Sequence, residues 1–532
     1  MGEQSVSKGF AVLSAAGIIV KLLSLLYIPF LLAIVGEEGN GIYAAANQVY
    51  VLLYAITNVG LPVAISKLVS ELIAVGNYKD AVRSFKIARF LLIILGVISA
   101  AIMAIFAKKI AIVMHYEKSY LAILFLSPAF LFTAVSSAYR GYFQGRGNMI
   151  PTAISQILEQ VVNAVFTLVF ASILIKKGLE WGCAGGMIGT ALAAFIAAIF
   201  LVRFHNSKGR MSENKNYISM DARRYTYSEL MKKVVGYSIP ITLSIGMQYA
   251  GNLIDVWNTK VRLMHGGYSE SMATELFSHL YKYQQLLNAP IAVMAALAAT
   301  ILPAISAAVA LRDKNKVKDR VNYAYRLCFL ITIPSALGFS VLSAPIYRML
   351  KYGQGSNLML YGSVALVMLA IVQIQTSILQ GAGKLYQVTF NLILGIIGKI
   401  VTNYFMVSIH EININGAIIG SIVGYIISIS LNSLVIRKTL KVKTRLLKNA
   451  FKPFIASVVM AIAAYGTYFL ITALLGHHYL IMTVSTLISI AVGAAAYFAS
   501  MVLIGGMEKE DLEILPTRLH RFIPTSLMNR IH

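Results

Sequence analysis

The segment Leu61-Pro62-Val63-Ala64-Ile65-Ser66 returns later in the chain as Leu302-Pro303-Ala304-Ile305-Ser306. A second segment, Gln144-Gly145-Arg146-Gly147, returns as Gln380-Gly381-Ala382-Gly383. The steps from 61 to 302 and from 144 to 380 are 241 and 236 residues. Two unrelated pairs at nearly one spacing indicate a duplicated unit of roughly 240 residues. In an apolar chain, such duplication is typical of transporters whose two halves face a shared pathway.

The composition of this 532-residue chain is that of a membrane protein. Hydrophobic residues make up 58% of it, charged residues only 13%, and the mean hydropathy is +0.73. Soluble domains contain about 45 to 50% apolar and about 25% charged residues. Apolar runs long enough to cross a hydrocarbon core of about 30 Å recur along nearly the whole length. We predict an all-α integral membrane protein with fourteen transmembrane helices, at residues 9–35, 42–74, 87–114, 120–139, 152–175, 182–202, 234–263, 280–310, 323–347, 357–380, 386–409, 412–436, 453–475 and 479–504.

The placement of Lys and Arg orients these predicted helices. The two tails and the loops on the side of the amino terminus together hold about 32 of the 46 Lys and Arg residues, the loops on the other side about 7 and the helices about 7. Because positively charged loops stay inside the cell, we predict a multi-pass plasma-membrane protein with both termini in the cytoplasm. The net charge of +25 has anionic lipid headgroups as its counterpart. The basic residues are spread over separate loops with no DNA-binding or RNA-binding module around them, so no nucleic-acid partner is expected.

The repeated segments divide the chain into two lobes. They lie in predicted helices 2 and 8 and after predicted helices 4 and 10, so each lobe contains six helices. Since six is even, both copies begin on the same membrane face, which makes the repeat parallel. The tail is either an interfacial amphipathic segment or disordered. The predicted boundaries are an N-lobe at 1–204, a cytoplasmic linker at 205–233, a C-lobe at 234–436, two appended helices within 437–504 and a cytoplasmic tail at 505–532.

No catalytic, cofactor or metal chemistry is indicated by the sequence. The chain has no phosphate-binding P-loop, no zinc-binding pair of histidines on a helix and no nucleophile elbow. Cys183 and Cys328 fall at opposite membrane faces in the predicted topology, so they are not expected to form a disulfide. We therefore expect neither an enzyme nor a protein that carries a cofactor.

Ionisable residues inside predicted helices are the main site candidates, because a charge near the bilayer centre costs at least about 2.5 kcal/mol. Lys21 follows Lys8 by 13 residues, or roughly 20 Å of helix, so it cannot easily reach either surface. Glu159 and Lys399 lie well inside predicted helices 5 and 11. For these two, a buried structural Glu–Lys pair and a role in transport are both open. A fixed cation such as Lys21 suits an anionic headgroup, for example a pyrophosphate, and not a cationic drug.

A second set of candidates concerns gates. Asp255, Lys260 and Arg262 lie near the outer end of predicted helix 7, where they form either an outer gate or a solvated helix end. Pro62 and Pro303 occupy equivalent places in the two lobes. Since proline removes a backbone donor and kinks a helix, we predict functional bends at both positions.

Three stretches of the sequence resemble a known family. They are Gly36-Glu37-Glu38-Gly39-Asn40-Gly41-Ile42-Tyr43, the stretch from Gly60 to Glu71, and Arg140-Gly141-Tyr142-Phe143-Gln144-Gly145 with its continuation to Gln160. Through them the chain resembles the polysaccharide-biosynthesis branch of the multidrug/oligosaccharidyl-lipid/polysaccharide exporter superfamily. The closest group there contains sporulation proteins and Gram-positive lipid II flippases. The resemblance runs through both lobes and the fourteen-helix plan.

This resemblance implies a V-shaped alternating-access transporter in a bacterial plasma membrane. Such proteins move undecaprenyl-pyrophosphate-linked peptidoglycan precursor, lipid II, from the inner to the outer leaflet. The implied partners are this lipid-linked anionic glycan, membrane lipids and cell-wall synthesis enzymes. In such proteins the two appended helices are associated with a groove for the lipid tail.

At the residue level the resemblance is incomplete. Lys21 resembles a first-helix cavity arginine of the Gram-negative flippases, whereas Gln285 stands where those proteins carry an arginine. The departure at Gln285 leaves open whether the substrate is lipid II or a related glycolipid. Asn163 completes the set of cavity candidates, with Lys21, Glu159, Lys399 and Gln285.

Two other functions stay open at this point. A drug/cation antiporter of the same superfamily would need unpaired acids in its cavity, but the predicted helices contain few acids, chiefly Glu159 and Asp255. A non-transporting membrane scaffold for cell-wall or spore-coat synthesis would need no polar cavity at all.

Overall fold

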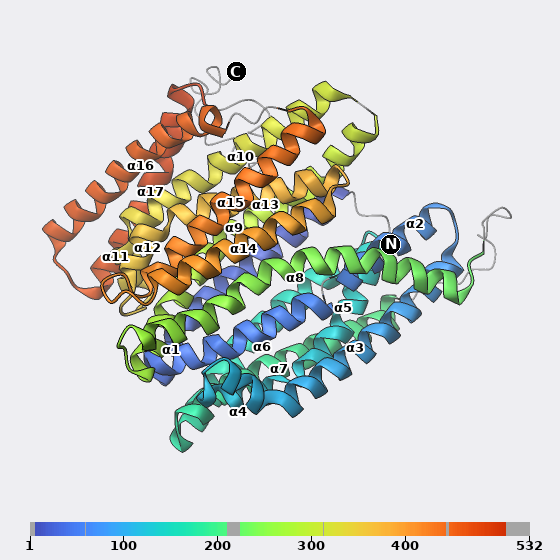
Figure 1. Ribbon diagram of the computed structural model, residues 1–532, viewed down its shortest axis with the longest axis horizontal. Coiled ribbons are helices and arrows are strands. Elements are labelled where there is room, and N and C mark those ends of the chain that lie inside the picture. Colours follow the sequence, from blue (N-terminus) through green and yellow to red (C-terminus); the bar gives the residue numbers. More distant parts are fainter. Residues whose placement is uncertain (1–5, 59, 210–223, 312, 443–445, 507–532) are drawn as a thin grey trace. The chain divides into compact units, whose positions relative to one another are not determined.

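The computed structural model describes residues 6–58, 60–209, 224–311, 313–442 and 446–506. From Met507 onward the predicted tail lies outside these residues, as does the stretch 210–223 of the predicted linker. Every regular element of the described chain is a helix, which confirms the predicted all-α class (Figure 1). Three short turns, η1 (Glu117–Ser119), η2 (Ile175–Lys177) and the π-turn η3 (His205–Gly209), accompany the main helices. The main helices are α1 (Val6–Asn58), α2 (Gly60–Ala74), α3 (Tyr78–Val113), α4 (Tyr120–Leu126), α5 (Ala129–Gly145), α6 (Ile150–Leu174), α7 (Leu179–Phe204), α8 (Tyr227–His265), α9 (Glu270–Ala310), α10 (Lys314–Val341), α11 (Ser343–Met349), α12 (Ser356–Gly362), α13 (Val364–Gly381), α14 (Leu385–Met406), α15 (Asn415–Leu440), α16 (Leu446–Leu475) and α17 (Tyr479–Leu503).

Each of the fourteen predicted spans overlaps one or two of these helices. Within the described residues, ten helices are long and apolar enough to cross a membrane, or eleven if the bent pair Glu117–Leu126 and Ala129–Gly145 counts as one span. One of the ten runs from Ala15 to Ala55 and overlaps two predicted spans. One helix in this count of ten therefore corresponds to two helices in the predicted count of fourteen. The number fourteen stays a prediction that agrees with the helices.

The long helix α1 is broken at the place where the sequence separates its first two spans. Gly36 has φ 70° and ψ −177°, a backbone conformation that glycine adopts without the steric penalty of a side chain. Pro62 lies within α2 and Pro303 within α9. The functional bends at these two positions stay predictions.

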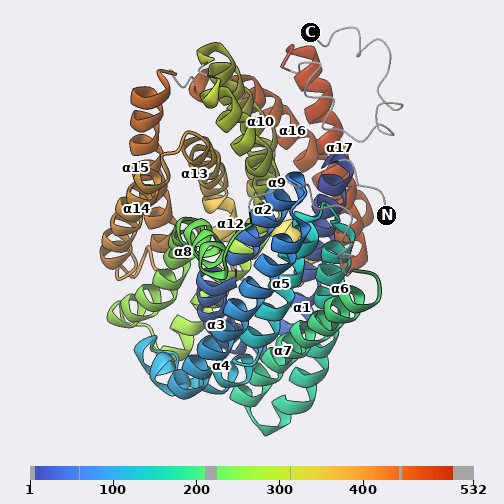
Figure 2. The same cartoon turned by 90° about the vertical axis from the view of Figure 1, so that its right-hand side faces the viewer.

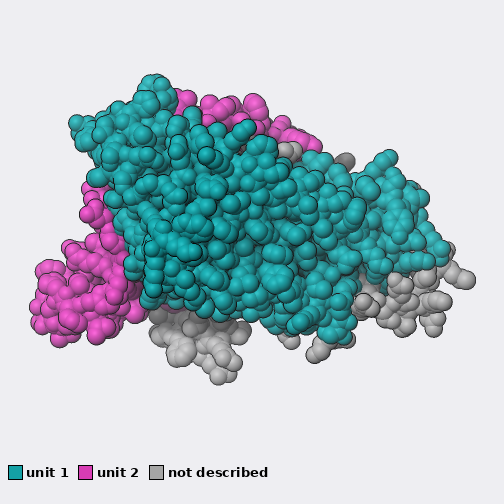
Figure 3. Space-filling view, turned by 90° about the horizontal axis from the view of Figure 1, so that it is seen from below, with its two compact units in different colours: residues 1–281, 403–414 teal, residues 282–402, 415–532 magenta. Residues whose placement is uncertain are grey.

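The helices form two compact units, coloured teal and magenta in Figure 3. Unit 1 consists of residues 1–281 and 403–414, and unit 2 consists of residues 282–402 and 415–532. Two of the unit boundaries fall inside helices α9 and α14. Within unit 1, α6 and α7 pack along each other, and within unit 2 α16 packs along α17 (Figures 1 and 2). The lobes 1–204 and 234–436 remain a prediction from the sequence repeats.

The repeated glycine turn has the same structure in both copies. Gly147 and Gly383 both lie in the left-handed region, with φ 70° and φ 73°. The two turns share one pattern of backbone hydrogen bonds: Gly147 N to Gln144 O (2.9 Å) and Asn148 N to Phe143 O (3.0 Å) in the first, Gly383 N to Gln380 O (3.0 Å) and Lys384 N to Leu379 O (2.8 Å) in the second. The same left-handed glycine and the same pattern of backbone hydrogen bonds therefore end α5 in unit 1 and α13 in unit 2.

The two repeated segments also pack against each other within each unit. A Cβ on Gly145 would lie 2.8 Å from the carbonyl oxygen of Ser66, and a Cβ on Gly381 would lie 2.7 Å from that of Leu302. Both distances are too short for any side chain, so glycine permits close contact of α5 with α2 and of α13 with α9. The sequence repeat therefore marks one helix contact that occurs in each unit.

Candidate functional site

Lys21 is placed in the interior of a membrane helix, as the sequence predicts. It lies 15 residues before the break at Gly36, or about 22 Å along α1. The residue is half-buried, and Ser24 Oγ donates a hydrogen bond to its backbone carbonyl at 2.7 Å. Among the ion pairs between described residues, none includes the Lys21 ammonium group. The charge of Lys21 is therefore not neutralised by an acid of the described chain.

Glu159 has a counter-ion on the neighbouring helix α5. Arg140 of α5 donates from Nη2 to Glu159 Oε2 at 2.6 Å and from Nε to Ser155 Oγ at 2.9 Å. The side chains of Arg140 and Glu159 are 11% and 26% exposed, so the pair is mostly shielded from solvent. Glu159 and Ser155 are one helical turn apart on α6, which lets both face Arg140. The acid is therefore balanced within unit 1 by Arg140, whereas the sequence suggests Lys399 as its partner.

The other cavity candidates are divided between the two units. In unit 1, Asn163 Oδ1 accepts hydrogen bonds from Thr167 Oγ1 at 3.1 Å and Thr190 Oγ1 at 3.0 Å, so it joins α6 to α7. In unit 2, Lys399 is buried on α14, and Gln285 is half-buried on α9, where it accepts a long hydrogen bond of 3.4 Å from Asn288. Lys21, Glu159 and Asn163 therefore belong to unit 1, and Lys399 and Gln285 to unit 2.

The gate candidates near the end of α8 are paired and not solvated. Asp255 is 1% exposed and accepts a hydrogen bond from Asn403 Nδ2 at 3.0 Å. Lys260 is 2% exposed, donates to Glu270 Oε1 at 2.9 Å and lies 4.1 Å from the centre of the Tyr116 ring. The guanidinium of Arg262 lies 3.3 Å from the centre of the Tyr404 ring. Of the two interpretations of this group, the solvated helix end does not describe Asp255 or Lys260.

A network of polar side chains joins the turn after Gly36 to the start of α9. We call it the charged clasp, and all of its members belong to unit 1. The contacts of the charged clasp are Lys118 Nζ to Glu38 Oε1 (2.7 Å), Ser271 Oγ to Glu38 Oε2 (2.8 Å), Ser278 Oγ to Glu37 Oε2 (2.8 Å), Asn40 Nδ2 to Ser278 Oγ (2.8 Å), Lys260 Nζ to Glu270 Oε1 (2.9 Å) and the looser pair of His279 Nε2 with Glu37 Oε2 (3.9 Å). In the predicted topology it lies at the outer membrane face. The glycines of the turn are needed there, since a Cβ on Gly41 would collide with the backbone of Thr274.

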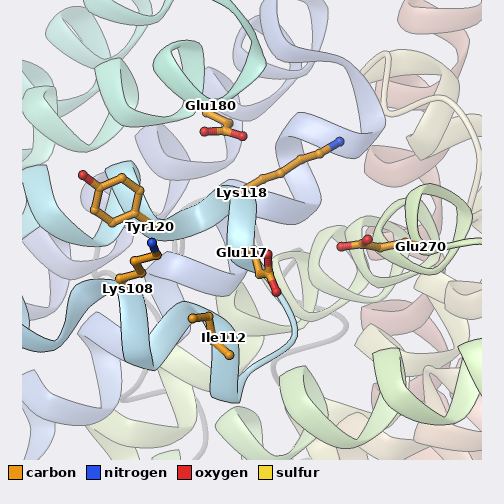
Figure 4. Close-up of a pocket in the computed structure, with 7 residues that line it drawn as sticks. All are labelled: Lys108, Ile112, Glu117, Lys118, Tyr120, Glu180 and Glu270. Carbon is orange, nitrogen blue, oxygen red and sulfur yellow. The ribbon is translucent and has the colours of Figure 1, made fainter.

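Beside the charged clasp lies a polar pocket of about 380 Å³ (Figure 4). Its wall is made by α3, η1, α4, α7 and α9, and in Figure 4 the carboxylate of Glu270 points toward η1. The lining residues are Lys108, Ile112, Glu117, Lys118, Tyr120, Glu180 and Glu270. Across the described part of the chain, no three His, Cys, Asp or Glu side chains are grouped so that they would hold a metal ion.

Unit 2 carries an apolar groove of about 340 Å³ between α10, α11, α16 and α17. Its lining is almost entirely apolar, and the hydroxyl of Ser489 is buried there without a hydrogen-bond partner. Gly338 leaves open space in the wall of the groove, because a Cβ at this position would meet only Met460 Cε, at 3.6 Å. The lining residues are Pro334, Ser335, Gly338, Phe339, Leu342, Ile346, Met460, Ala464, Ser489, Ile490, Gly493, Ala494 and Tyr497.

The fold is that of a known class of membrane transport proteins. The chain is similar to a multidrug resistance MATE family transporter of the MOP superfamily in its inward-facing conformation, with a TM-score of 0.63, 17% identity, and coverage of 80% of this chain and 96% of that one. The outward-facing conformation of such a transporter gives a TM-score of 0.59 at 19% identity, with 82% and 96% of the two chains covered. The predicted all-α fold class is thereby confirmed.

The family follows from the sequence. The polysaccharide biosynthesis protein family matches residues 6–309, more than half of the chain, and the chain belongs to that family. Stage V sporulation protein B of Bacillus subtilis (strain 168) is 26% identical and covers 88% of this chain and 91% of its own length. Lipid II flippase MurJ of the same organism is 24% identical and covers 97% of both chains.

Proposed function

We propose that this protein moves a lipid-linked anionic glycan from the inner to the outer leaflet of a bacterial plasma membrane, with both of its termini in the cytoplasm. The observation that carries the proposal is Lys21, a cation about 22 Å from the end of its helix segment and without an acidic partner in the described chain. The finer proposal is that the substrate is lipid II, since a lipid II flippase is among the relatives.

The charge of this site favours an anionic substrate over a cationic drug. A fixed ammonium group replaces the water that phosphate oxygens lose on leaving the surface, and charge-assisted hydrogen bonds are the stronger kind. The acid that a drug antiporter would use to attract cations, Glu159, is already neutralised by Arg140. Lys21 has no acidic partner in the described chain, and its charge suits a pyrophosphate.

The lipid tail would bind at a different site from the headgroup. The apolar groove of unit 2 lies against the appended helices α16 and α17, where the family resemblance expects the tail. A polyprenyl chain bound there keeps its apolar surface out of water while the headgroup moves. Each CH₂ that stays buried contributes about 0.8 kcal/mol, so even a few carbons in the groove stabilise the bound lipid.

The charged clasp acts as the outer gate in this proposal. Alternating access requires that contacts on one membrane face form while those on the other face open. The Lys118–Glu38 pair of the clasp is half exposed on the lysine side, so its net stabilisation is small enough to be reversed in each cycle. Cell-wall synthesis enzymes would deliver the substrate inside and use it outside.

The direct test is transport by the purified protein alone. We would reconstitute it in vesicles that contain a fluorescent polyprenyl-pyrophosphate disaccharide-peptide and measure the fraction that becomes accessible to an impermeant quencher. The proposal expects equilibration between leaflets that protein-free vesicles do not show. Sealed vesicles in which the protein does not accelerate this equilibration would contradict the proposal. That result would favour a scaffold role without transport. Uptake of a cationic dye driven by an ion gradient, with no lipid movement, would identify a drug antiporter instead.

A further inference from the structure

A pair of tyrosines lies on α1 in unit 1. Tyr50 and Tyr54 are one helical turn apart, with ring centroids 5.8 Å apart and an interplanar angle of 32°. Both are half-buried, so part of each side chain is uncovered by the described chain. The two rings therefore form one aromatic surface in unit 1.

This surface is held rigidly from behind. Phe130 of α5 is fully buried and packs against Tyr50, with ring centroids 5.1 Å apart. Rings that are already packed lose little conformational freedom when a ligand covers their open faces. The pair of rings is therefore pre-formed as a binding surface.

Polar groups of both kinds border the rings. Thr133, Ser137 and Arg140 share one face of α5, because they are spaced by four and three residues. Phe130, which packs against Tyr50, shares this face of α5, so the Arg140–Glu159 pair borders the rings along the same helix. Since the two charges cancel, this surface has no excess of cations with which to hold a phosphate. It offers hydrogen-bond donors and acceptors next to aromatic faces.

That combination matches a pyranose sugar. A pyranose presents a patch of C–H groups that packs on the negative face of an aromatic ring, and a rim of hydroxyls that both donate and accept hydrogen bonds. We propose that Tyr50 and Tyr54, with the Arg140–Glu159 pair, bind the sugar part of a lipid-linked substrate, while Lys21 holds its phosphates. This inference rests on the proposed function and assigns the glycan to a place within unit 1.

The test compares lipids that differ only in the glycan. The full-length protein in nanodiscs is titrated with polyprenyl pyrophosphate, with the same lipid bearing a disaccharide, and with the lipid bearing a disaccharide-peptide. Tyr54→Leu is expected to weaken binding of both sugar-bearing lipids about tenfold and to leave binding of the sugar-free lipid within about twofold. Tyr54→Phe keeps the ring face and is expected to bind like the wild type. Tyr386→Leu makes the same change on an exposed residue of unit 2 and is the matched control.

Three outcomes overturn the inference: equal weakening for the sugar-free lipid, no weakening by Tyr54→Leu, and weakening confined to the peptide-bearing lipid. Saturation-transfer NMR with the free disaccharide separates this inference from the proposed function. Wild-type protein that saturates pyranose C–H protons, with the signal lost in Tyr54→Leu, supports the sugar site even if the protein fails to flip lipid. Flipping without any effect of Tyr54 on either measurement overturns the sugar site alone.

Discussion

Lys21 is a cation that must meet water or an anion, because leaving an ammonium group uncompensated in the bilayer interior is expensive. If the anion is the pyrophosphate of the substrate, Lys21→Ala removes a charge-assisted contact, and transport of the lipid-linked glycan should fall at least about tenfold. Lys21→Arg keeps the charge and should retain most of the activity. The measurement is the initial rate of lipid movement in vesicles with equal amounts of folded protein. Equal rates for Lys21→Ala and the wild type would remove this residue from the site.

The Arg140–Glu159 pair makes a second prediction at the residue scale. Replacing Glu159 by Leu leaves Arg140 mostly buried without its counter-ion, which should destabilise the protein by about 1 to 3 kcal/mol, a value reduced for the partial exposure of the pair. Removing both charges in Arg140→Met/Glu159→Leu should restore much of that loss. Thermal unfolding midpoints in detergent of the wild type, the two single variants and the double variant complete the cycle. A double variant that loses as much as the two single losses combined would show that the two residues do not interact.

The sequence indicates Lys21 but misses Arg140, because the predicted helix ends carry an error of a few residues and only Arg140 lies close to such an end. Lys21 lies so far from any polar loop that an error of a few residues in the boundary does not matter. The predicted fourth span ends at residue 139, so Arg140 is assigned to a cytoplasmic loop, whereas α5 continues to Gly145. Hydropathy alone cannot extend a helix through an arginine whose charge is balanced by a residue on another helix.

At the scale of elements, helix bends follow glycine and proline in different ways. Gly36 breaks α1 because its positive φ leaves the helical region. Pro128 lies at the junction of a bent pair, Glu117–Leu126 and Ala129–Gly145, which meet at 43°. Pro303 lies within the described helix α9. The sequence predicts where spans begin and end, but it does not show which of these prolines bends its helix.

The apolar groove of unit 2 gives a prediction at this scale. Gly338→Leu should fill part of the groove, since only Met460 lies near the position of the new side chain. Transport of a lipid with a long polyprenyl tail should slow several-fold, because the loss of a few buried CH₂ groups costs about 0.8 kcal/mol each. A substrate with a short isoprenoid tail that does not need the groove should move at the wild-type rate. Unequal expression is controlled by normalising to folded protein, and an equal slowing of both substrates would contradict a role in tail binding.

At the scale of the whole molecule, the repeats predict a duplicated transporter fold, and the structure confirms the fold class. The charged clasp could not be predicted from the sequence. Asn40 and Ser278 hydrogen-bond across 238 residues of chain, and no periodicity or spacing relates them. Glu37 and Glu38 belong to a stretch that carries the family resemblance, and only their contacts with α9 show that they form part of the charged clasp.

If this protein carries its lipid substrate by opening and closing at the charged clasp, a cross-link across the clasp should stop transport. Ser271 Oγ and Glu38 Oε2 are 2.8 Å apart, so cysteines at these two positions can be joined by a short thiol-reactive linker that contains a disulfide. The native Cys183 and Cys328 are buried, which limits background reaction. Cross-linked Glu38→Cys/Ser271→Cys protein should move the lipid-linked glycan at least about tenfold more slowly than the single-cysteine variants, and reduction of the disulfide should restore the rate. Cross-linked protein that moves the lipid at the uncross-linked rate would contradict the account.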